Sequence, residues 1–305
     1  MQKKYAGYVA VIISGIIFGC MPLLAKIIFN NGGNPINLVF WRFFIAILPL
    51  YIIVKLNKTI SLEITKVELK QIVTLGILGY SGTGVSLFLS YNYITTGMAT
   101  TLHFLYPVFV ILGYSFFYKQ KINLPKFIAV ALCTLGIILL YDGSESVSII
   151  GILLAFLSAL TQAFYILYID KSGLKTMNPI KLTMYLCMVG SFVMFIFSSL
   201  SGNFTLDLNL TGWLASATLS IAVALGAVSL LSVGIKLIGP QSSSILSTLE
   251  PITSVIIGSV VFGEVLGIRG IIACALILFS VIIIAVFDIR ESKKKEAYMS
   301  DIISK

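Results

Sequence analysis

Apolar residues run along the chain in ten long blocks, separated by short segments that contain polar residues, glycine or proline. A bilayer core about 30 Å thick needs about 20 apolar residues of helix at 1.5 Å each, and the blocks have about that length. The pattern therefore predicts an all-α integral membrane protein with ten transmembrane helices. The expected spans are 5–29, 36–55, 70–92, 97–118, 125–141, 149–170, 180–199, 211–234, 240–262 and 266–287.

Composition agrees with a membrane protein and excludes a soluble globular enzyme. The 305 residues are 58% hydrophobic and 11% charged, whereas soluble domains carry about 25% charged residues. Ten spans leave room only for short connections and a polar segment at 288–305, which is expected to be a solvated, partly disordered cytoplasmic tail. No metal-ligand spacing and no ATP-binding G-x-x-x-x-G-K-[ST] loop occur, so neither a metal nor a cofactor is expected.

Lysine and arginine are divided unequally between the two sets of predicted loops. One set holds nearly all of them, including the pair at residues 3 and 4, the group at 55–70 and the cluster at 290–295. Because basic residues accumulate on the cytoplasmic side, both termini are predicted to be cytoplasmic in a multi-pass protein of the cell membrane. The net charge of +9 therefore reports orientation and does not predict a nucleic-acid partner.

An internal repeat appears when the chain is shifted by 144 positions. Asn34-Pro35-Ile36 then falls on Asn178-Pro179-Ile180, and equivalent matches are Gly7 with 151, Ser14 with 158, Gly82 with 226 and Pro107 with 251. The repeat predicts two domains, 1–141 and 149–287, with five helices each. Because five is odd, the second copy enters the bilayer from the opposite face. Inverted repeats are typical of secondary transporters, whose substrate site lies near the midplane between the halves.

Three motifs carry a family resemblance. The first is Leu249-Glu250-Pro251-Ile252, followed by Phe262-Gly263-Glu264 and Gly267; the second is its counterpart, Leu105-Tyr106-Pro107-Val108 through Tyr118-Lys119-Gln120; the third is Phe40-Trp41-Arg42-Phe43. Over nearly its whole length the chain resembles the EamA-type ten-helix transporters of the drug/metabolite transporter superfamily. It departs from the family pattern at Lys119-Gln120, where Gly-Glu is usual.

The resemblance implies a secondary transporter that exports amino acids or related metabolites by alternating access. Its partners would be a small-molecule substrate and the lipid bilayer, with protons as one candidate coupling ion. A quaternary-ammonium or drug exporter and a passive facilitator are the alternatives, although small multidrug exporters carry a glutamate in the first helix and this chain has none there. An intramembrane enzyme with His103 as base is a remote alternative that no G-x-S-x arrangement supports, so no catalytic residue is expected.

Two ionisable residues inside the predicted spans are candidates for substrate binding. Glu250 lies about ten residues into its span, and a carboxylate at such depth is a functional-site hypothesis by default. Glu250 is expected either to bind substrate or a proton, or to be a structural partner for a helix end. His103, the single histidine, either titrates near neutral pH in the site or is a hydrogen-bonded interior residue.

Prolines inside three spans predict helix kinks at Pro22, Pro107 and Pro251. Proline removes the hydrogen bond to the carbonyl four residues earlier, which would free the carbonyls of His103 and Ser247. Such kinks are tolerated where they line protein or a water-filled cavity. They either face the central pathway or are packing kinks satisfied by nearby hydroxyls.

Several polar side chains complete the predicted site. They are expected either to orient an amphipathic metabolite or to pack in the core: Ser247, Tyr106, Tyr80, Gln162 and Tyr165. Lys26 and Arg42 lie near helix ends, where long basic side chains reach the membrane interface. We expect these two residues to be structural anchors.

The charge distribution makes a testable prediction about topology. Reporter domains fused after Lys175 and Lys295 should be cytoplasmic, and one fused after Asp142 should be extracytoplasmic, because basic loops stay inside. Paired reporters that are active on opposite sides of the membrane measure this directly. A cytoplasmic signal after Asp142 would contradict both the span count and the inverted repeat.

Overall fold

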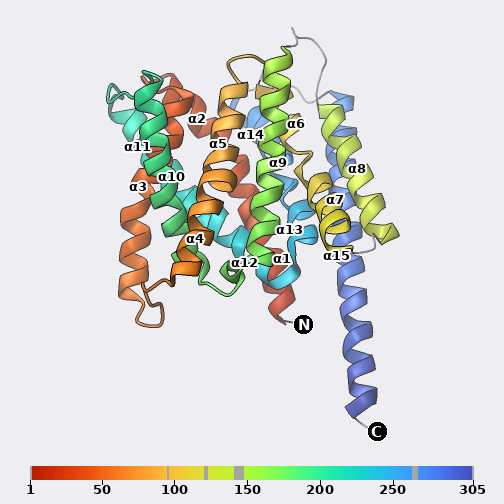
Figure 1. Ribbon diagram of the computed structural model, residues 1–305. Helices are drawn as coiled ribbons and strands as arrows, with labels where there is room; N and C mark the ends of the chain where they lie inside the picture. Colours follow the sequence, from red (N-terminus) through yellow and green to blue (C-terminus); the bar gives the residue numbers. More distant parts are fainter. Residues whose placement is uncertain (1, 95, 120–122, 141–147, 263–266, 304–305) are drawn as a thin grey trace.

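A computed structural model describes residues 2–94, 96–119, 123–140, 148–262 and 267–303. Every regular element in these ranges is a helix, and the helices stand side by side as an upright bundle with both chain ends toward the lower end in Figure 1. The predicted all-α class is therefore confirmed. The motif residues Gln120, Gly263 and Glu264, the loop residue Asp142 and the domain boundary at 141 lie outside the described residues.

The helices follow the predicted spans with shifts of a few residues, although several spans are divided. In the first half they are α1 (Gln2–Gly19), α2 (Met21–Phe29), α3 (Pro35–Leu56), α4 (Lys66–Thr74), α5 (Gly82–Ser90), α6 (Thr96–His103), α7 (Tyr106–Tyr118) and α8 (Leu124–Leu140). In the second half they are α9 (Ile149–Lys171), α10 (Pro179–Leu200), α11 (Leu210–Ile221), α12 (Ser229–Ile238), α13 (Pro240–Leu246), α14 (Leu249–Phe262) and α15 (Ile268–Ile303). π-Helical turns at Leu75–Ser81 and Ala222–Val228 join α4 to α5 and α11 to α12.

Six continuous apolar stretches among the described residues are long enough to cross a bilayer. They are Lys4–Phe29, Pro35–Leu56, Lys66–Ser90, Ile149–Lys171, Pro179–Leu200 and Leu210–Ile238. Shorter apolar helices occupy Tyr106–Tyr118, Leu124–Leu139 and Ile268–Ile284. The membrane-embedded character is thus confirmed, whereas the number of ten spans stays a prediction.

The three predicted proline kinks lie where one helix ends and the next begins. Pro22 and Pro107 are the second residues of α2 and α7, and Pro251 is the third residue of α14. A proline is tolerated in the first turn of a helix, where its missing N–H has no intrahelical acceptor. The expectation of a freed Ser247 carbonyl is wrong, because this carbonyl accepts a 3.0 Å hydrogen bond from the Glu250 backbone N–H.

The C-terminal segment also differs from expectation. Instead of a separate, partly disordered tail from residue 288, α15 continues as one helix to Ile303 and extends below the other helices (Figure 1). After Gly270 this segment contains neither glycine nor proline. Its polar part contains lysine and glutamate, which are good helix formers, so nothing in the sequence ends the helix at the apolar boundary.

The repeated Asn-Pro pairs start equivalent helices in the two halves. The Asn34 side chain accepts a 2.8 Å bond from the Asn37 backbone N–H, and the Asn178 side chain accepts 3.0 and 3.3 Å bonds from Ile180 and Lys181. Asparagine is a strong N-cap, and proline fits the first helical position that follows it. The tripeptide therefore fixes where α3 and α10 begin.

Packing between the halves follows the 144-residue offset. Gly7 on α1 lies against Leu237 and Ile238, and its repeat equivalent Gly151 on α9 lies against the equivalent residues, Tyr93 and Ile94. At the level of helices, α1 packs on α12 and α9 on α5, while α3 packs on α10 and α8 on α15. A two-fold relation between the repeats would produce this exchange of equivalent partners.

Gly19 marks the closest approach of α1 to α14. A Cβ atom at this position would lie 2.4 Å from the Cβ of Thr253 and 2.8 Å from the backbone oxygen of Glu250. The side chain of Ser254 also donates a 3.0 Å hydrogen bond to the Gly19 carbonyl. Small residues are typical of such contacts between membrane helices because they let backbones approach.

We predict that Gly19→Ala forces α1 and α14 apart and lowers the free energy of unfolding by about 1–3 kcal/mol, the usual range for overpacking. The melting temperature of the purified protein in detergent measures the effect. Gly267→Ala is the control, because a Cβ at Gly267 meets nothing within 4 Å. Equal melting temperatures for the two variants would contradict the close contact.

Candidate functional site

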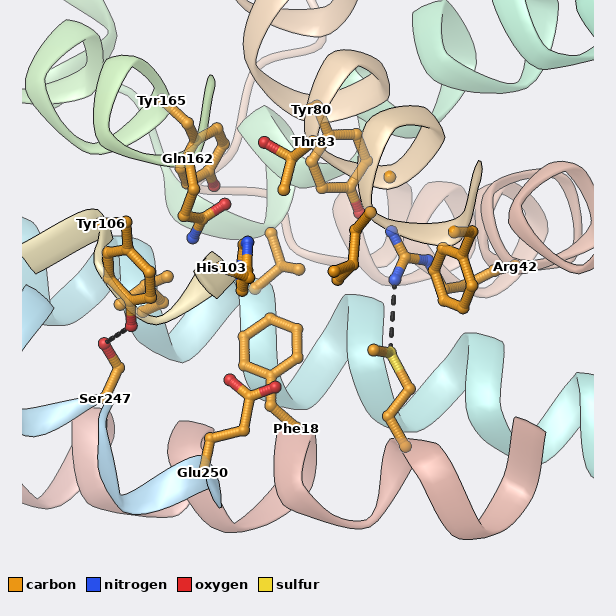
Figure 2. Close-up of a pocket in the computed structure, with 16 residues that line it drawn as sticks. Phe18, Arg42, Tyr80, Thr83, His103, Tyr106, Gln162, Tyr165, Ser247 and Glu250 are labelled. Atoms are coloured by element: carbon orange, nitrogen blue, oxygen red, sulfur yellow. Dashed lines mark hydrogen bonds between the residues drawn. The ribbon is translucent and has the colours of Figure 1, made fainter. Parts of the chain in front are cut away.

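One cavity lies between helices of both halves (Figure 2). The space open to the centres of water molecules in this cavity is about 70 Å³. This is enough for several waters or a small metabolite. Its walls combine aromatic, polar and charged side chains: Phe18, Met21, Arg42, Tyr80, Thr83, Gly84, Leu87, Phe88, His103, Tyr106, Gln162, Tyr165, Val228, Leu231, Ser247 and Glu250.

The structure brings all seven residues proposed for substrate binding to this cavity. They come from four parts of the fold, and they are Tyr80 before α5, His103 and Tyr106 at the α6–α7 break, Gln162 and Tyr165 on α9, and Ser247 and Glu250 at the α13–α14 break. The prolines themselves do not line the cavity, but the residue before Pro107 and the residue before Pro251 do. The helix breaks therefore present neighbouring side chains to the cavity.

Arg42 is the main cavity residue that sequence reasoning placed elsewhere. Its side chain was expected to reach the membrane interface, whereas the residue is 9% exposed and its guanidinium faces the cavity (Figure 2). The cavity-facing positions Tyr80, Thr83, Gly84 and Leu87 recur at helical spacing on the neighbouring element. The polar residues Tyr80 and Thr83 among them were the available signal. Lys26, the other predicted anchor, is exposed on α2.

The cavity residues pair by the same 144-residue offset as the rest of the chain. Six pairs account for twelve of the sixteen lining residues: Phe18 with Gln162, Met21 with Tyr165, Gly84 with Val228, Leu87 with Leu231, His103 with Ser247 and Tyr106 with Glu250. A cavity on the axis that relates two repeats would be lined in this way. Its position thus agrees with the midplane site that inverted repeats place between their halves.

The two halves supply different chemistry to this shared position. Glu250 occupies the place of Tyr106, and Arg42 is replaced in the second half by Leu186, which does not line the cavity. The cavity therefore receives one acidic and one basic side chain, each from a different half. These charges lie on opposite sides of the cavity, with the Phe18 ring between them in the view of Figure 2.

Hydrogen bonds fix several of the cavity side chains. The hydroxyls of Tyr106 and Ser247 are 2.5 Å apart and join the two broken spans, and Nδ1 of His103 lies 3.0 Å from the Ser158 hydroxyl. Tyr165 lies 3.4 Å from the hydroxyl of Ser232. A partnered hydroxyl or imidazole holds its orientation without a ligand, so these walls are preformed.

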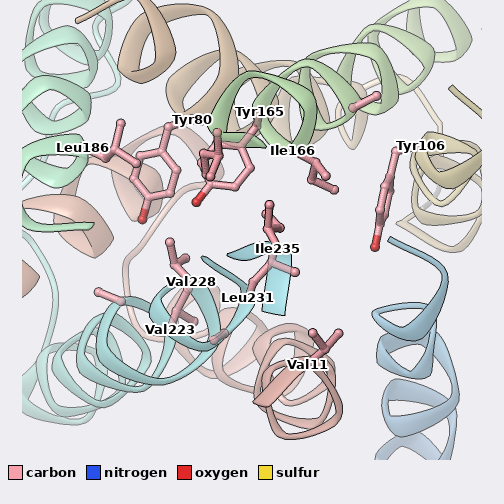
Figure 3. Close-up of a cluster of buried hydrophobic side chains, with 14 of the residues drawn as sticks. Val11, Tyr80, Tyr106, Tyr165, Ile166, Leu186, Val223, Val228, Leu231 and Ile235 are labelled. Carbon is pink, nitrogen blue, oxygen red and sulfur yellow. The ribbon is translucent and has the colours of Figure 1, made fainter. Parts of the chain in front are cut away.

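The cavity is closed toward the end of the bundle where the N-terminus lies. Past the cavity residues on α1, α9 and α12 come Val11, Ile166 and Ile235, which are fully buried and pack in the apolar cluster of Figure 3. An apolar layer of this kind prevents a charged solute from passing.

A charged cluster lies beyond that layer at the same end. Asp170 near the end of α9 accepts hydrogen bonds from the Tyr114 hydroxyl on α7 and, at 2.6 Å, from Lys175. Lys171 lies 3.6 Å from the Asp170 carboxylate and over the rings of Tyr114 and Tyr118, at 4.8 and 4.6 Å. The cluster ties α7 of the first half to α9 of the second.

Comparison with known proteins identifies the family. The model of the EamA-like transporter family matches residues 5–142 and again residues 149–286. The chain belongs to the EamA-like transporter family. This confirms the resemblance drawn from the proline motifs and the Arg42 stretch.

Relatives of this EamA-like transporter carry general names. One uncharacterized transporter of Archaeoglobus fulgidus is 32% identical over 184 residues, which cover 59% of this chain and 63% of that protein. A second from the same organism is 23% identical over 91% of this chain and 95% of its own length. A solved crystal structure with 17% sequence identity has a TM-score of 0.80 and covers 95% of this chain and 98% of its own, which shows a shared fold.

Proposed function

We propose that this EamA-like protein is a secondary transporter that exports a small organic metabolite, an amino acid or a related compound, by alternating access. The observation that carries the proposal is the cavity between the halves, lined at repeat-equivalent positions and containing Arg42 and Glu250. Export and the amino-acid class rest on the family resemblance. The substrate site consists of Glu250, His103, Ser247, Tyr106, Tyr80, Gln162 and Tyr165.

Alternating access is supported by the packing that separates the cavity from one end of the bundle. The apolar layer of Val11, Ile166 and Ile235 and the Asp170 cluster lie on one side only of the cavity residues along α1, α9 and α12. The opposite state requires these contacts to separate while equivalent helices close the other end. Repeats that exchange partners supply two packings of similar energy, and a substrate that binds both states allows the change.

We place the protein in the cell membrane, with the closed end of the bundle on the cytoplasmic side. Both chain ends lie at this end of the bundle (Figure 1), and the basic loops favour the cytoplasmic side. Protons are the proposed coupling ion, because Glu250 is an acidic group in the cavity that can exchange a proton with water.

A quaternary-ammonium or drug exporter is the second candidate. The rings of Phe18, Tyr80 and Phe88 together with Glu250 offer the surroundings that a cation prefers. Arg42 in the same cavity opposes a purely cationic substrate, since its like charge would be desolvated beside it. A passive facilitator would share the site but would not depend on an acidic residue.

The enzyme alternative has one structural observation in its favour, the 3.0 Å contact between His103 and the Ser158 hydroxyl. Ser158 is fully buried, lies outside the cavity lining and donates its proton to the Ala155 carbonyl at 2.6 Å. A nucleophile must be reachable by substrate and give its proton to the base. The contact therefore supports a structural role for Ser158.

We predict that Glu250→Gln leaves the protein folded but abolishes transport or makes its rate independent of pH. The substitution keeps size and hydrogen bonding while removing the charge that binds a cationic group or a proton. Proteoliposomes are loaded with a mixture of amino acids and quaternary-ammonium compounds, and mass spectrometry measures the efflux of each compound at several pH values. The control is Glu63→Gln, which changes an exposed loop position.

Wild-type efflux with an unchanged pH profile in Glu250→Gln would contradict the assignment of Glu250. If the wild-type protein releases none of the compounds faster than empty liposomes, the proposed function itself fails.

A further inference from the structure

The guanidinium of Arg42 is buried at the cavity without an acidic partner. Its Nε atom is buried and has no hydrogen-bond partner, and Nη1 contacts only the thioether sulfur of Met21, at 3.4 Å, among the contacts of the described residues. A thioether is a weak acceptor. The ring of Phe43 lies 4.8 Å from the guanidinium carbon, which stabilises the cation but leaves its N–H donors unused.

Glu250 does not neutralise Arg42 in this conformation. No ion pair joins the two side chains in the part of the chain that the structure describes, and Figure 2 shows them on opposite walls of the cavity. A buried charge without a partner is strongly destabilising. Arg42 is such a charge, and Glu250 is an ionisable side chain that faces the same cavity. A ligand that brings a negative group to Arg42 and a positive group to Glu250 would explain both.

Space for the negative group exists in front of Arg42. Gly84 lies opposite the guanidinium, and a Cβ atom there would lie 3.8 Å from Nη2 of Arg42 and 3.1 Å from a methyl carbon of Val39. Any larger side chain at this position would cover the N–H donors. Arginine binds carboxylates with two parallel hydrogen bonds, and the glycine leaves its fork open to the cavity.

We propose that Arg42 is a specificity-determining residue that binds the carboxylate of a zwitterionic substrate while Glu250 binds its ammonium group. The inference rests on the proposed transport function and narrows it: the common backbone of amino acids is recognised at the two charged walls. The aromatic walls of Phe18, Tyr80 and Phe88 then contact the substrate side chain. A single-charge compound would leave one of the two protein charges buried and unpaired.

Thermal-shift titration of the purified protein tests this specificity. The standard amino acids are screened first, and the most stabilising one is compared with its carboxamide, which keeps only the positive charge, and its deaminated acid, which keeps only the negative charge. A ligand that binds the folded state raises the melting temperature according to its concentration and Kd. We expect the wild type to bind both analogues at least about tenfold more weakly, as a lost charge-assisted hydrogen bond predicts.

Variants assign each charge to a wall of the cavity. Arg42→Gln should weaken binding of the amino acid at least about tenfold and leave binding of its carboxamide unchanged. Glu250→Gln should likewise weaken binding of the amino acid at least about tenfold, and it should leave binding of the deaminated acid unchanged. Arg42→Lys keeps the charge without the fork and should fall between, and it serves if Arg42→Gln does not fold. Lys26→Gln, which removes a positive charge from an exposed site on α2, should match the wild type.

Several results would overturn the inference. The first is that no amino acid raises the melting temperature. The second is that the wild type binds an amino acid and either analogue equally well. The third is that the Arg42→Gln variant still prefers the amino acid over its carboxamide. If a cation alone binds and is transported by proteoliposomes, the zwitterion inference fails while the transport function stands. If no compound is transported but amino acids bind as predicted, the specificity stands and the transport function fails.

Discussion

Hydrocarbon offers no hydrogen-bond partner, so every polar group in the apolar bundle must find a partner inside the protein. Two serines illustrate the rule, since Ser14 donates to the Ala227 carbonyl at 2.7 Å and Ser254 donates to that of Gly19. The helix breaks obey it as well, because each new helix begins with a proline in its first turn. Arg42 departs from this rule with a full charge: a cation without an ion-pair partner at a cavity indicates where a ligand completes the structure.

The repeat gives the site its position, and the differences between its copies give the site its chemistry. Equivalent residues such as Leu87 and Leu231 line opposite walls because equivalent helices meet at the axis between the halves. Perfect symmetry would put identical groups on both walls, which cannot distinguish the two ends of a substrate. Replacement of a tyrosine by Glu250, and of a leucine by Arg42, separates opposite charges across the axis. An asymmetric substrate then has one orientation in a nearly symmetric cavity.

Much of this arrangement follows from the sequence, because hydropathy and the 144-residue offset are properties of the chain itself. The apolar blocks predicted the helices, the Asn-Pro pairs predicted two helix starts, and the ionisable or hydroxyl-bearing residues within spans predicted seven cavity residues. Three features depend on tertiary geometry and were missed. Neighbouring contacts decide whether Pro251 kinks or breaks its span. The surroundings of α15 decide whether this helix ends at residue 288. The space left by Gly84 decides whether Arg42 points inward or to the membrane interface.

The central claim is that one cavity between the halves opens alternately to each side of the membrane. Accessibility of a single thiol at Gln162, on the cavity wall, tests it most directly. In a variant with Gln162→Cys and the four native cysteines replaced, a membrane-impermeant thiol reagent is applied to right-side-out and to inside-out vesicles. The account predicts labelling from both sides, with labelling from one side blocking subsequent labelling from the other. Labelling from one side only under all substrate conditions, or from neither side, would contradict it.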